Sequence, residues 1–137
     1  MRLLPDTNTI SYLLRNDRQV RAQFDSALEK PETVFVLSPM VDFELRRYLL
    51  LKEASRNLRQ YEALVESWMP VSLGESDWRL AASLWAERHR AGEPIEDADL
   101  LIAVSALRLN AALVTSNPRH FSNLGLTLVD WRQPIPT

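Results

Sequence analysis

Short apolar runs alternate with longer amphipathic segments along almost all of this 137-residue sequence, and this alternation limits the possible folds more than any other feature. The short runs are only a few residues long, too short for helices, and several are rich in β-branched residues, which is typical of buried strands. The longer segments place apolar residues three and four positions apart, as one face of a helix requires. This pattern predicts an α/β fold with helices on both faces of a parallel sheet.

The alternation divides the chain into a series of expected elements. We expect four to five strands, chosen from residues 2–5, 34–37, 71–73, 112–115 and 127–130. The first helix should begin after residue 6, and the others should cover 18–30, 39–52, 55–69, 75–91 and 98–109, with a helical turn at 118–123. No linker interrupts this order, so residues 1–132 are expected to form a single domain and residues 133–137 a loose C-terminal tail.

The composition excludes several classes of protein. The chain has no cysteine, which excludes disulfide scaffolds, thiol catalysis and cysteine-ligated zinc. Its formal net charge of -2 disfavours a protein that coats nucleic acid, but not an enzyme that contacts a few phosphates in one cleft. No apolar run approaches the roughly 20 residues that span a bilayer, and Asp6 interrupts the apolar start of the chain. We therefore expect a cytoplasmic protein without a membrane segment.

Three acidic residues stand where a folded chain does not need a charge. Asp6 directly follows the first expected strand, at the sheet edge where α/β folds place their ligand sites. Glu44 and Asp99 fall on or beside the apolar faces of their helices, where a lone carboxylate is costly to bury. Each acid taken alone also has a structural explanation. Asp6 can cap the following helix, Glu44 can pair with Arg47, and the third acid can stabilise a helix start.

These acids lie within a set of motifs that spans nearly the whole chain. The motifs are LLPDTN at 3–8, SPMVDFEL at 38–45, the DLLIA core of 95–106, LVTSN at 113–117 and LTLVDW at 126–131. In this order and spacing they resemble a PIN-domain ribonuclease of the VapC type, the toxin of a type II toxin–antitoxin system. The resemblance implies a PIN-like three-layer α/β/α fold around a central, mostly parallel sheet of four to five strands.

The resemblance also implies a function and a set of site residues. Asp6, Glu44 and Asp99 match the acidic positions that are catalytic and hold Mg²⁺ or Mn²⁺ in such nucleases. The candidates for substrate binding are Thr7, Asn8, Thr115, Asn117, Arg119 and His120. His120 stands where the family often has a further acid, which puts a second metal position in doubt. The implied protein is a Mg²⁺-dependent endoribonuclease toxin that hydrolyses RNA phosphodiester bonds, is neutralised by a cognate antitoxin and forms a homodimer.

A metal site also follows from electrostatics if the three acids converge. Two carboxylates about 4 Å apart repel each other by about 4 kcal/mol at an effective dielectric of 20, so such a cluster needs a cation. With no cysteine and only two histidines in the chain, a hard ion such as Mg²⁺ is favoured over zinc. The implied hydrolysis leaves 5′-phosphate and 3′-hydroxyl ends, because the 2′-hydroxyl of the substrate takes no part.

Arginines and tryptophans provide further candidates. Four arginines flank the acids in sequence and are candidates for RNA backbone contacts, with solvated surface as the alternative: Arg46, Arg88, Arg90 and Arg119. Three tryptophans lie on helical stripes and are expected in the core or in a dimer surface: Trp68, Trp78 and Trp85. Trp131 is expected to cover the sheet edge, and Asp42 to be solvated.

Two other functions fit parts of the sequence. The chain could be a catalytically inactive PIN-like module that binds RNA or protein, with its site altered at His120. It could also be a phosphotransfer protein with Asp6 or Asp99 as the acceptor. The second function is disfavoured because a receiver needs a lysine near its C-terminal strands, and no lysine follows Lys52.

Overall fold

A five-stranded parallel sheet forms the centre of the computed structural model, which describes residues 1–133. The strands lie in the order β3-β2-β1-β4-β5, and every neighbouring pair is parallel. They are β1 (Arg2–Pro5), β2 (Val34–Leu37), β3 (Met69–Pro70), β4 (Ala112–Val114) and β5 (Leu128–Val129). This sheet confirms the predicted α/β class. Of the expected tail at 133–137, residues 134–137 lie outside the described part of the chain.

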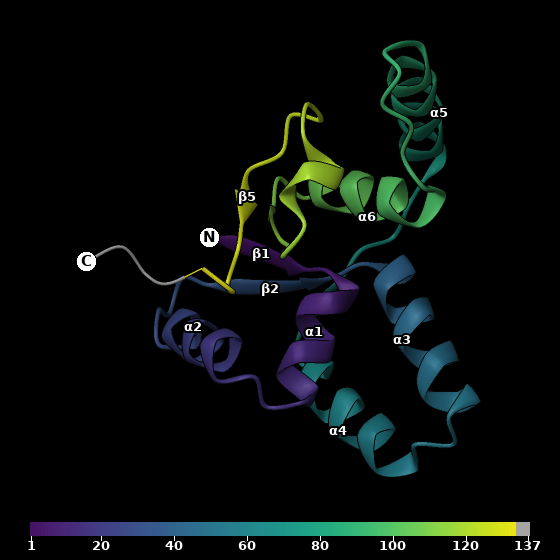
Figure 1. Ribbon diagram of the computed structural model, residues 1–137. Coiled ribbons are helices and arrows are strands. Elements are labelled where there is room, and N and C mark those ends of the chain that lie inside the picture. Colours follow the sequence, from purple (N-terminus) through teal and green to yellow (C-terminus); the bar gives the residue numbers. More distant parts are fainter. Residues whose placement is uncertain (134–137) are drawn as a thin grey trace.

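Helices cover the sheet on both sides, as Figure 1 shows, with α1 and α2 on one side and α6 on the other. Helix α3 contacts both α1 and α6, and α5 packs against α6. The described part of the chain has six α-helices, α1 (Thr7–Leu14), α2 (Arg18–Leu28), α3 (Pro39–Leu51), α4 (Ser55–Val65), α5 (Glu75–Arg90) and α6 (Asp97–Arg108), and a short 3₁₀ helix, η1, at Pro118–Phe121. None of the helices within residues 1–133 combines the length and the apolar character needed to cross a membrane.

A cluster of four aromatic side chains fills the core under β2. The ring of Phe35 lies 4.9 Å from that of Phe24 and 5.2 Å from that of Trp68, measured between centroids. Trp131 completes the cluster, 6.0 Å from Phe24 and edge-on to it. Trp131 was expected to cover the sheet edge, because it follows the edge strand β5. Its side chain instead packs against Phe35 of β2, on the far side of the central strand β1.

Strand β3 and the end of α4 differ from the predicted bounds. The helix expected to run to Met69 ends at Val65, and the strand expected at 71–73 lies at Met69–Pro70. The strand is set by pairing with β2, since Met69 and Pro70 lie opposite Val36 and Leu37. Proline is tolerated there because β3 is an edge strand and an edge residue need not donate a hydrogen bond to a neighbour.

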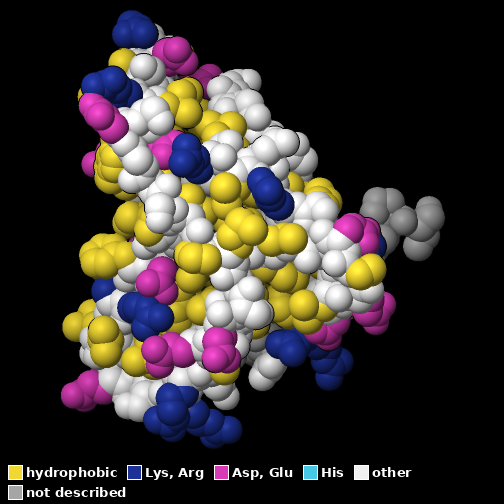
Figure 2. All heavy atoms as spheres, turned by 180° about the vertical axis from the view of Figure 1, so that it is seen from behind, with side chains coloured by type: hydrophobic (Ala, Val, Ile, Leu, Met, Phe, Trp, Pro, Cys, Tyr) yellow, Lys and Arg dark blue, Asp and Glu magenta, His cyan; other side chains and the backbone are white. Residues whose placement is uncertain are grey.

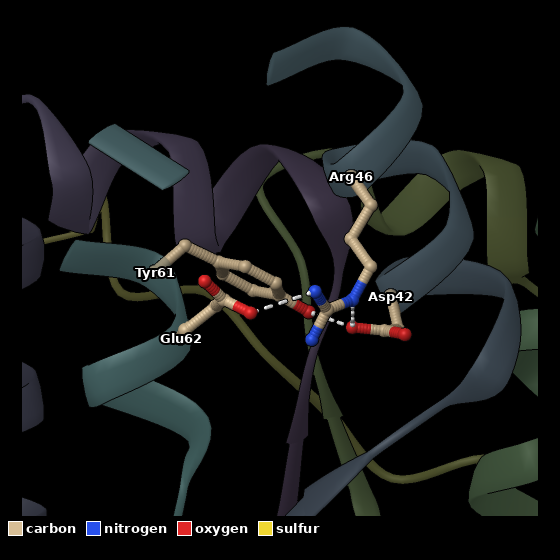
Figure 3. A network of polar contacts seen from close by, with 4 residues as sticks. All are labelled: Asp42, Arg46, Tyr61 and Glu62. Atoms are coloured by element: carbon tan, nitrogen blue, oxygen red, sulfur yellow. Dashed lines mark hydrogen bonds and ion pairs between the residues drawn. The ribbon is translucent and has the colours of Figure 1, made fainter. Parts of the chain in front are cut away.

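A polar network fixes α3 against α4 (Figure 3). The hydroxyl of Tyr61 donates to Oδ1 of Asp42 at 2.6 Å, and Nε of Arg46 donates to the same oxygen at 2.9 Å. Arg46 also pairs with Glu62, 3.1 Å away. Two expectations are corrected here. Asp42 is engaged rather than solvated, and Arg46 is held by two carboxylates instead of being free for RNA.

Candidate active site

Asp6 is positioned by the sheet itself. Its backbone N–H donates to the carbonyl of Val114 at 2.9 Å, which continues the β1–β4 ladder by one residue. Its carboxylate caps α1 by accepting from the backbone N–H of Thr9 at 2.9 Å. The capping role considered from the sequence is therefore confirmed. The side chain is nonetheless buried, and burial raises its pKa, with a smaller contribution in the same direction from the charge of Glu44.

Asp99 lies in the first turn of α6, with 28% of its side chain exposed. Burial raises the pKa of this carboxyl, and the negative charges of Glu44 and Asp6 raise it further. His120 approaches from η1. Its Nδ1 is 3.4 Å from Oδ2 of Asp99, and this contact lowers the pKa of Asp99.

Glu44 reaches the same place from α3. Its Oε1 accepts a hydrogen bond of 2.7 Å from the hydroxyl of Thr7, the first residue of α1. Its Oε2 lies 3.8 Å from the guanidinium of Arg47, so the pairing considered from the sequence is present but long. The side chain keeps 22% of its surface exposed.

Buried serines join the two helices that carry these acids. The hydroxyls of Ser38, at the start of α3, and Ser105, on α6, lie 3.1 Å apart and are fully buried. The hydroxyl of Ser105 also donates to the carbonyl of Leu101 at 2.8 Å. This contact fixes α3 relative to α6 without using a charged group.

The three acids therefore come from three elements and lie within electrostatic reach of one another. Glu44 raises the pKa of Asp6, and both raise the pKa of Asp99. Their oxygen-only donor set and mutual repulsion fit a hard divalent cation. As the side chains stand, however, no group of three acids or histidines within residues 1–133 has the geometry to hold a metal ion. Thr7 holds Glu44, and His120 lies against Asp99, so both carboxylates would have to turn to share an ion.

The other predicted site residues divide into two groups. Thr115 is fully buried beside Asp6, and a hydrogen bond from Thr115 lowers the pKa of Asp6. The hydroxyl of Thr115 also accepts from the backbone N–H of Asn117 at 3.0 Å. Four other predicted residues are exposed and lie after β4, on η1 and on α1: Asn117, Arg119, His120 and Asn8. Arg90 is exposed as well.

Arg88 has a different role from the one expected. It is buried, and its guanidinium donates to the backbone carbonyls of Glu93, at 2.7 Å, and of Ser122, with His120 more distant at 3.5 Å. It therefore binds the loop before α6 and the end of η1 to α5, and is not available for RNA. Sequence reasoning missed this role, although the spacing of seven residues from buried Ala81 places Arg88 on the inner face of α5.

Known proteins match the chain in both sequence and structure. The PIN domain family model matches residues 3–125. Ribonuclease VapC1 of Haemophilus influenzae strain R2866 is 33% identical over 129 residues, which cover 92% of this chain and 95% of that protein. The structure of VapBC-1 from nontypeable Haemophilus influenzae aligns with a TM-score of 0.84 and 30% identity over 97% of this chain and 100% of the matched chain.

A more distant structure shows the same fold. VapBC2 from Rickettsia felis, bound to a DNA fragment from its promoter, aligns with a TM-score of 0.84 at 22% identity, covering 96% of this chain and 99% of the matched chain. The family model and the Haemophilus relatives extend over nearly all of the sequence, and the three acids lie within the residues that the family model matches. The chain thus belongs to the PIN-domain family and is similar to its VapC-type members.

Proposed function

We propose that this protein is a Mg²⁺-dependent endoribonuclease toxin that hydrolyses RNA phosphodiester bonds. The observation that supports this most directly is the placement of Asp6, Glu44 and Asp99, which separate elements bring to the carboxyl ends of parallel strands, where the charge of Glu44 raises the pKa of both aspartates. The name of the 33% identical relative, Ribonuclease VapC1, supports the substrate class.

In the proposed site, Asp6 and Asp99 would bind the ion, and Mg²⁺ would supply charge stabilisation at the phosphate and a water of lowered pKa. Glu44 would complete the ligand set or accept the proton of the attacking water at Oε2, since its Oε1 already accepts from Thr7. Mn²⁺ could serve in the same position, because both ions prefer oxygen ligands. His120 and Arg119, exposed on η1, would contact phosphates of the RNA.

Cleavage of a 5′-labelled single-stranded RNA tests this function. The wild-type protein should cut it in Mg²⁺, stop in EDTA and leave 5′-phosphate and 3′-hydroxyl ends. Asp99→Asn should reduce cleavage by at least about 100-fold, whereas Asp97→Asn, an exposed acid in the same turn of α6, should cleave like the wild type. Equal activity of the two variants would contradict the assignment. Binding of RNA without any cleavage by the wild type would instead indicate an inactive PIN-like module.

We also propose that the protein forms a homodimer. Aromatic and aliphatic side chains reach the surface in pairs seven residues apart on α3 and α5: Phe43 and Leu50, and Trp78 and Trp85, each at least 43% exposed. Along the left edge of Figure 2, the side on which α3 and α5 lie, hydrophobic side chains reach the surface. Stripes of this kind commonly mark protein interfaces.

Light scattering after gel filtration tests the dimer. Phe43→Arg or Trp85→Arg should give a monomer, whereas Leu28→Arg, which replaces an exposed leucine on α2, should leave the mass unchanged. A wild-type monomer, or dimers in both Arg variants, would refute this surface.

The partner that we propose for the toxin is a cognate antitoxin, because one similar solved structure is a VapBC protein at 30% identity. The product of a short neighbouring gene should copurify with the chain and abolish its cleavage of RNA. The proposal would be contradicted if no protein encoded by a neighbouring gene bound to this chain.

A further inference from the structure

A hollow of about 500 Å³ opens beside the acids, where α1, α3 and α4 meet. Thr7 and Glu44, which are hydrogen-bonded to each other at the acidic site, also form part of its wall. The hollow and the acidic site are therefore continuous. A substrate strand bound at the acids can therefore extend into this hollow without leaving the protein surface.

The walls of the hollow carry groups that differ from those of the acidic site. Arg15, at the end of α1, and Arg47, on α3, provide two guanidinium groups, and Asn57, on α4, provides an amide. Tyr48 presents its ring with 56% of its surface exposed. Guanidinium groups suit phosphates, amides suit the edges of bases, and aromatic faces suit stacked bases.

Apolar side chains complete the hollow: Leu14, Leu45 and Leu49. They make it unsuitable for a hydrated metal ion or a free phosphate, but they suit the flat face of a nucleobase. The charge balance leads to the same class of ligand. Two arginines and one glutamate line the hollow, so it carries a net positive charge close to the point where a phosphate must bind.

We infer that this hollow is a subsite for one nucleotide of the RNA, the nucleotide next to the scissile phosphate. Tyr48 stacks on its base, Asn57 contacts the base edge, and Arg15 and Arg47 contact the adjoining phosphate. This inference rests on the proposed ribonuclease function. A protein segment could also enter the hollow, but the arginines and the continuity with the acids favour RNA.

Binding of a fluorescent single-stranded RNA, measured by anisotropy, tests the subsite. The measurement uses Asp99→Asn as the parent, in Mg²⁺, because this variant should bind without cutting. Adding Tyr48→Ala should weaken binding about 5- to 50-fold, as expected for the loss of one stacked base. Adding Arg15→Met should weaken it several-fold and reduce its salt dependence. Adding Arg59→Met, which removes an exposed arginine of α4 outside the hollow, should have no comparable effect.

Steady-state cleavage by the otherwise wild-type protein provides a second readout. Tyr48→Ala should raise KM while kcat changes by less than about twofold, because a group that binds substrate and transition state equally affects binding alone. Thermal unfolding checks that the variants are folded.

The results separate the two proposals. If the wild type neither binds nor cuts RNA, the proposed function fails. If it does both, and Tyr48→Ala and Arg15→Met behave like Arg59→Met, the ribonuclease stands and the nucleotide subsite is overturned, whichever other molecule enters the hollow.

Discussion

Replacement of Arg88 by methionine is expected to destabilise the fold and to loosen the segment that carries His120. Methionine keeps much of the apolar stem of arginine but removes the donors that bind the carbonyls of Glu93 and Ser122. The third contact, to the carbonyl of His120 at 3.5 Å, is too long to add much. Two close hydrogen bonds from one buried guanidinium therefore set the size of the effect.

Hydrogen bonds to a charged group contribute about 1.5–3 kcal/mol each, and water can reach the carbonyls of Glu93 and Ser122, which are not buried, after the guanidinium is removed. Relief from burying the guanidinium offsets part of this loss. We therefore expect the free energy of unfolding to fall by about 2–4 kcal/mol. At roughly 4 °C per kcal/mol for a chain of this length, Tm should fall by roughly 8–16 °C.

Urea and thermal unfolding followed by circular dichroism measure this change. Arg90→Met, which replaces an exposed arginine two residues later on α5, is the matched control and should change stability by no more than about 0.5 kcal/mol. Arg88→Lys should be intermediate, because one ammonium cannot reproduce the planar set of donors. Amide hydrogen exchange should become faster at residues 118–123 in Arg88→Met. Equal unfolding midpoints for Arg88→Met and Arg90→Met would refute the reasoning.

Other predictions concern the acids and the contact between α3 and α4. Burial and the charge of Glu44 raise the pKa of Asp6 above 3.8 in the folded state, so stability is lost as pH rises from about 3.8 through that raised pKa. Asp6→Asn, which can still cap α1, should therefore be more stable than the wild type in EDTA at pH 7, and the difference should vanish below about pH 3.8. Mg²⁺ or Mn²⁺ should raise the Tm of the wild type but not of Asp99→Asn, as measured by scanning fluorimetry. Tyr61→Phe removes the 2.6 Å bond to Asp42 and should lower the free energy of unfolding by about 1–2 kcal/mol in urea, so an unchanged midpoint would contradict that role.

The parts of the fold that depend on local pattern were predictable from the sequence. The apolar run at Val34–Leu37 is β2, and the Ser38-Pro39 pair starts α3 with Ser38 as its cap, as a hydroxyl followed by proline predicts. Strand β3 was not predictable in the same way. Pro70 signals the end of a helix locally, but it lies in a strand because pairing with β2, more than thirty residues earlier, decides its conformation.

The same distinction explains which side chains were misassigned. Glu44 and Asp99 stood out because a charge on or beside an apolar helix face is visible in the sequence, and Asp6 stood out because it directly follows an expected strand. Arg46 and Arg88 were wrongly assigned to RNA, because their partners come from segments that only the fold brings close. Arg46 pairs with Glu62 on α4, and Arg88 donates to the carbonyls of Glu93 and Ser122.

The arrangement of the acids depends mainly on contacts that do not involve their charges. The β1–β4 ladder, in which Pro5 lies opposite Val114, places Asp6 beside Thr115. The hydroxyl of Thr9 strengthens this edge by donating to the carbonyl of Val114 at 3.1 Å, and Ser38 joins α3 to α6. Since neutral groups hold the scaffold, replacing a carboxylate by an amide of the same shape should leave the backbone in place. A loss of cleavage in such a variant would then report on the chemistry of the site rather than on the folding of the chain.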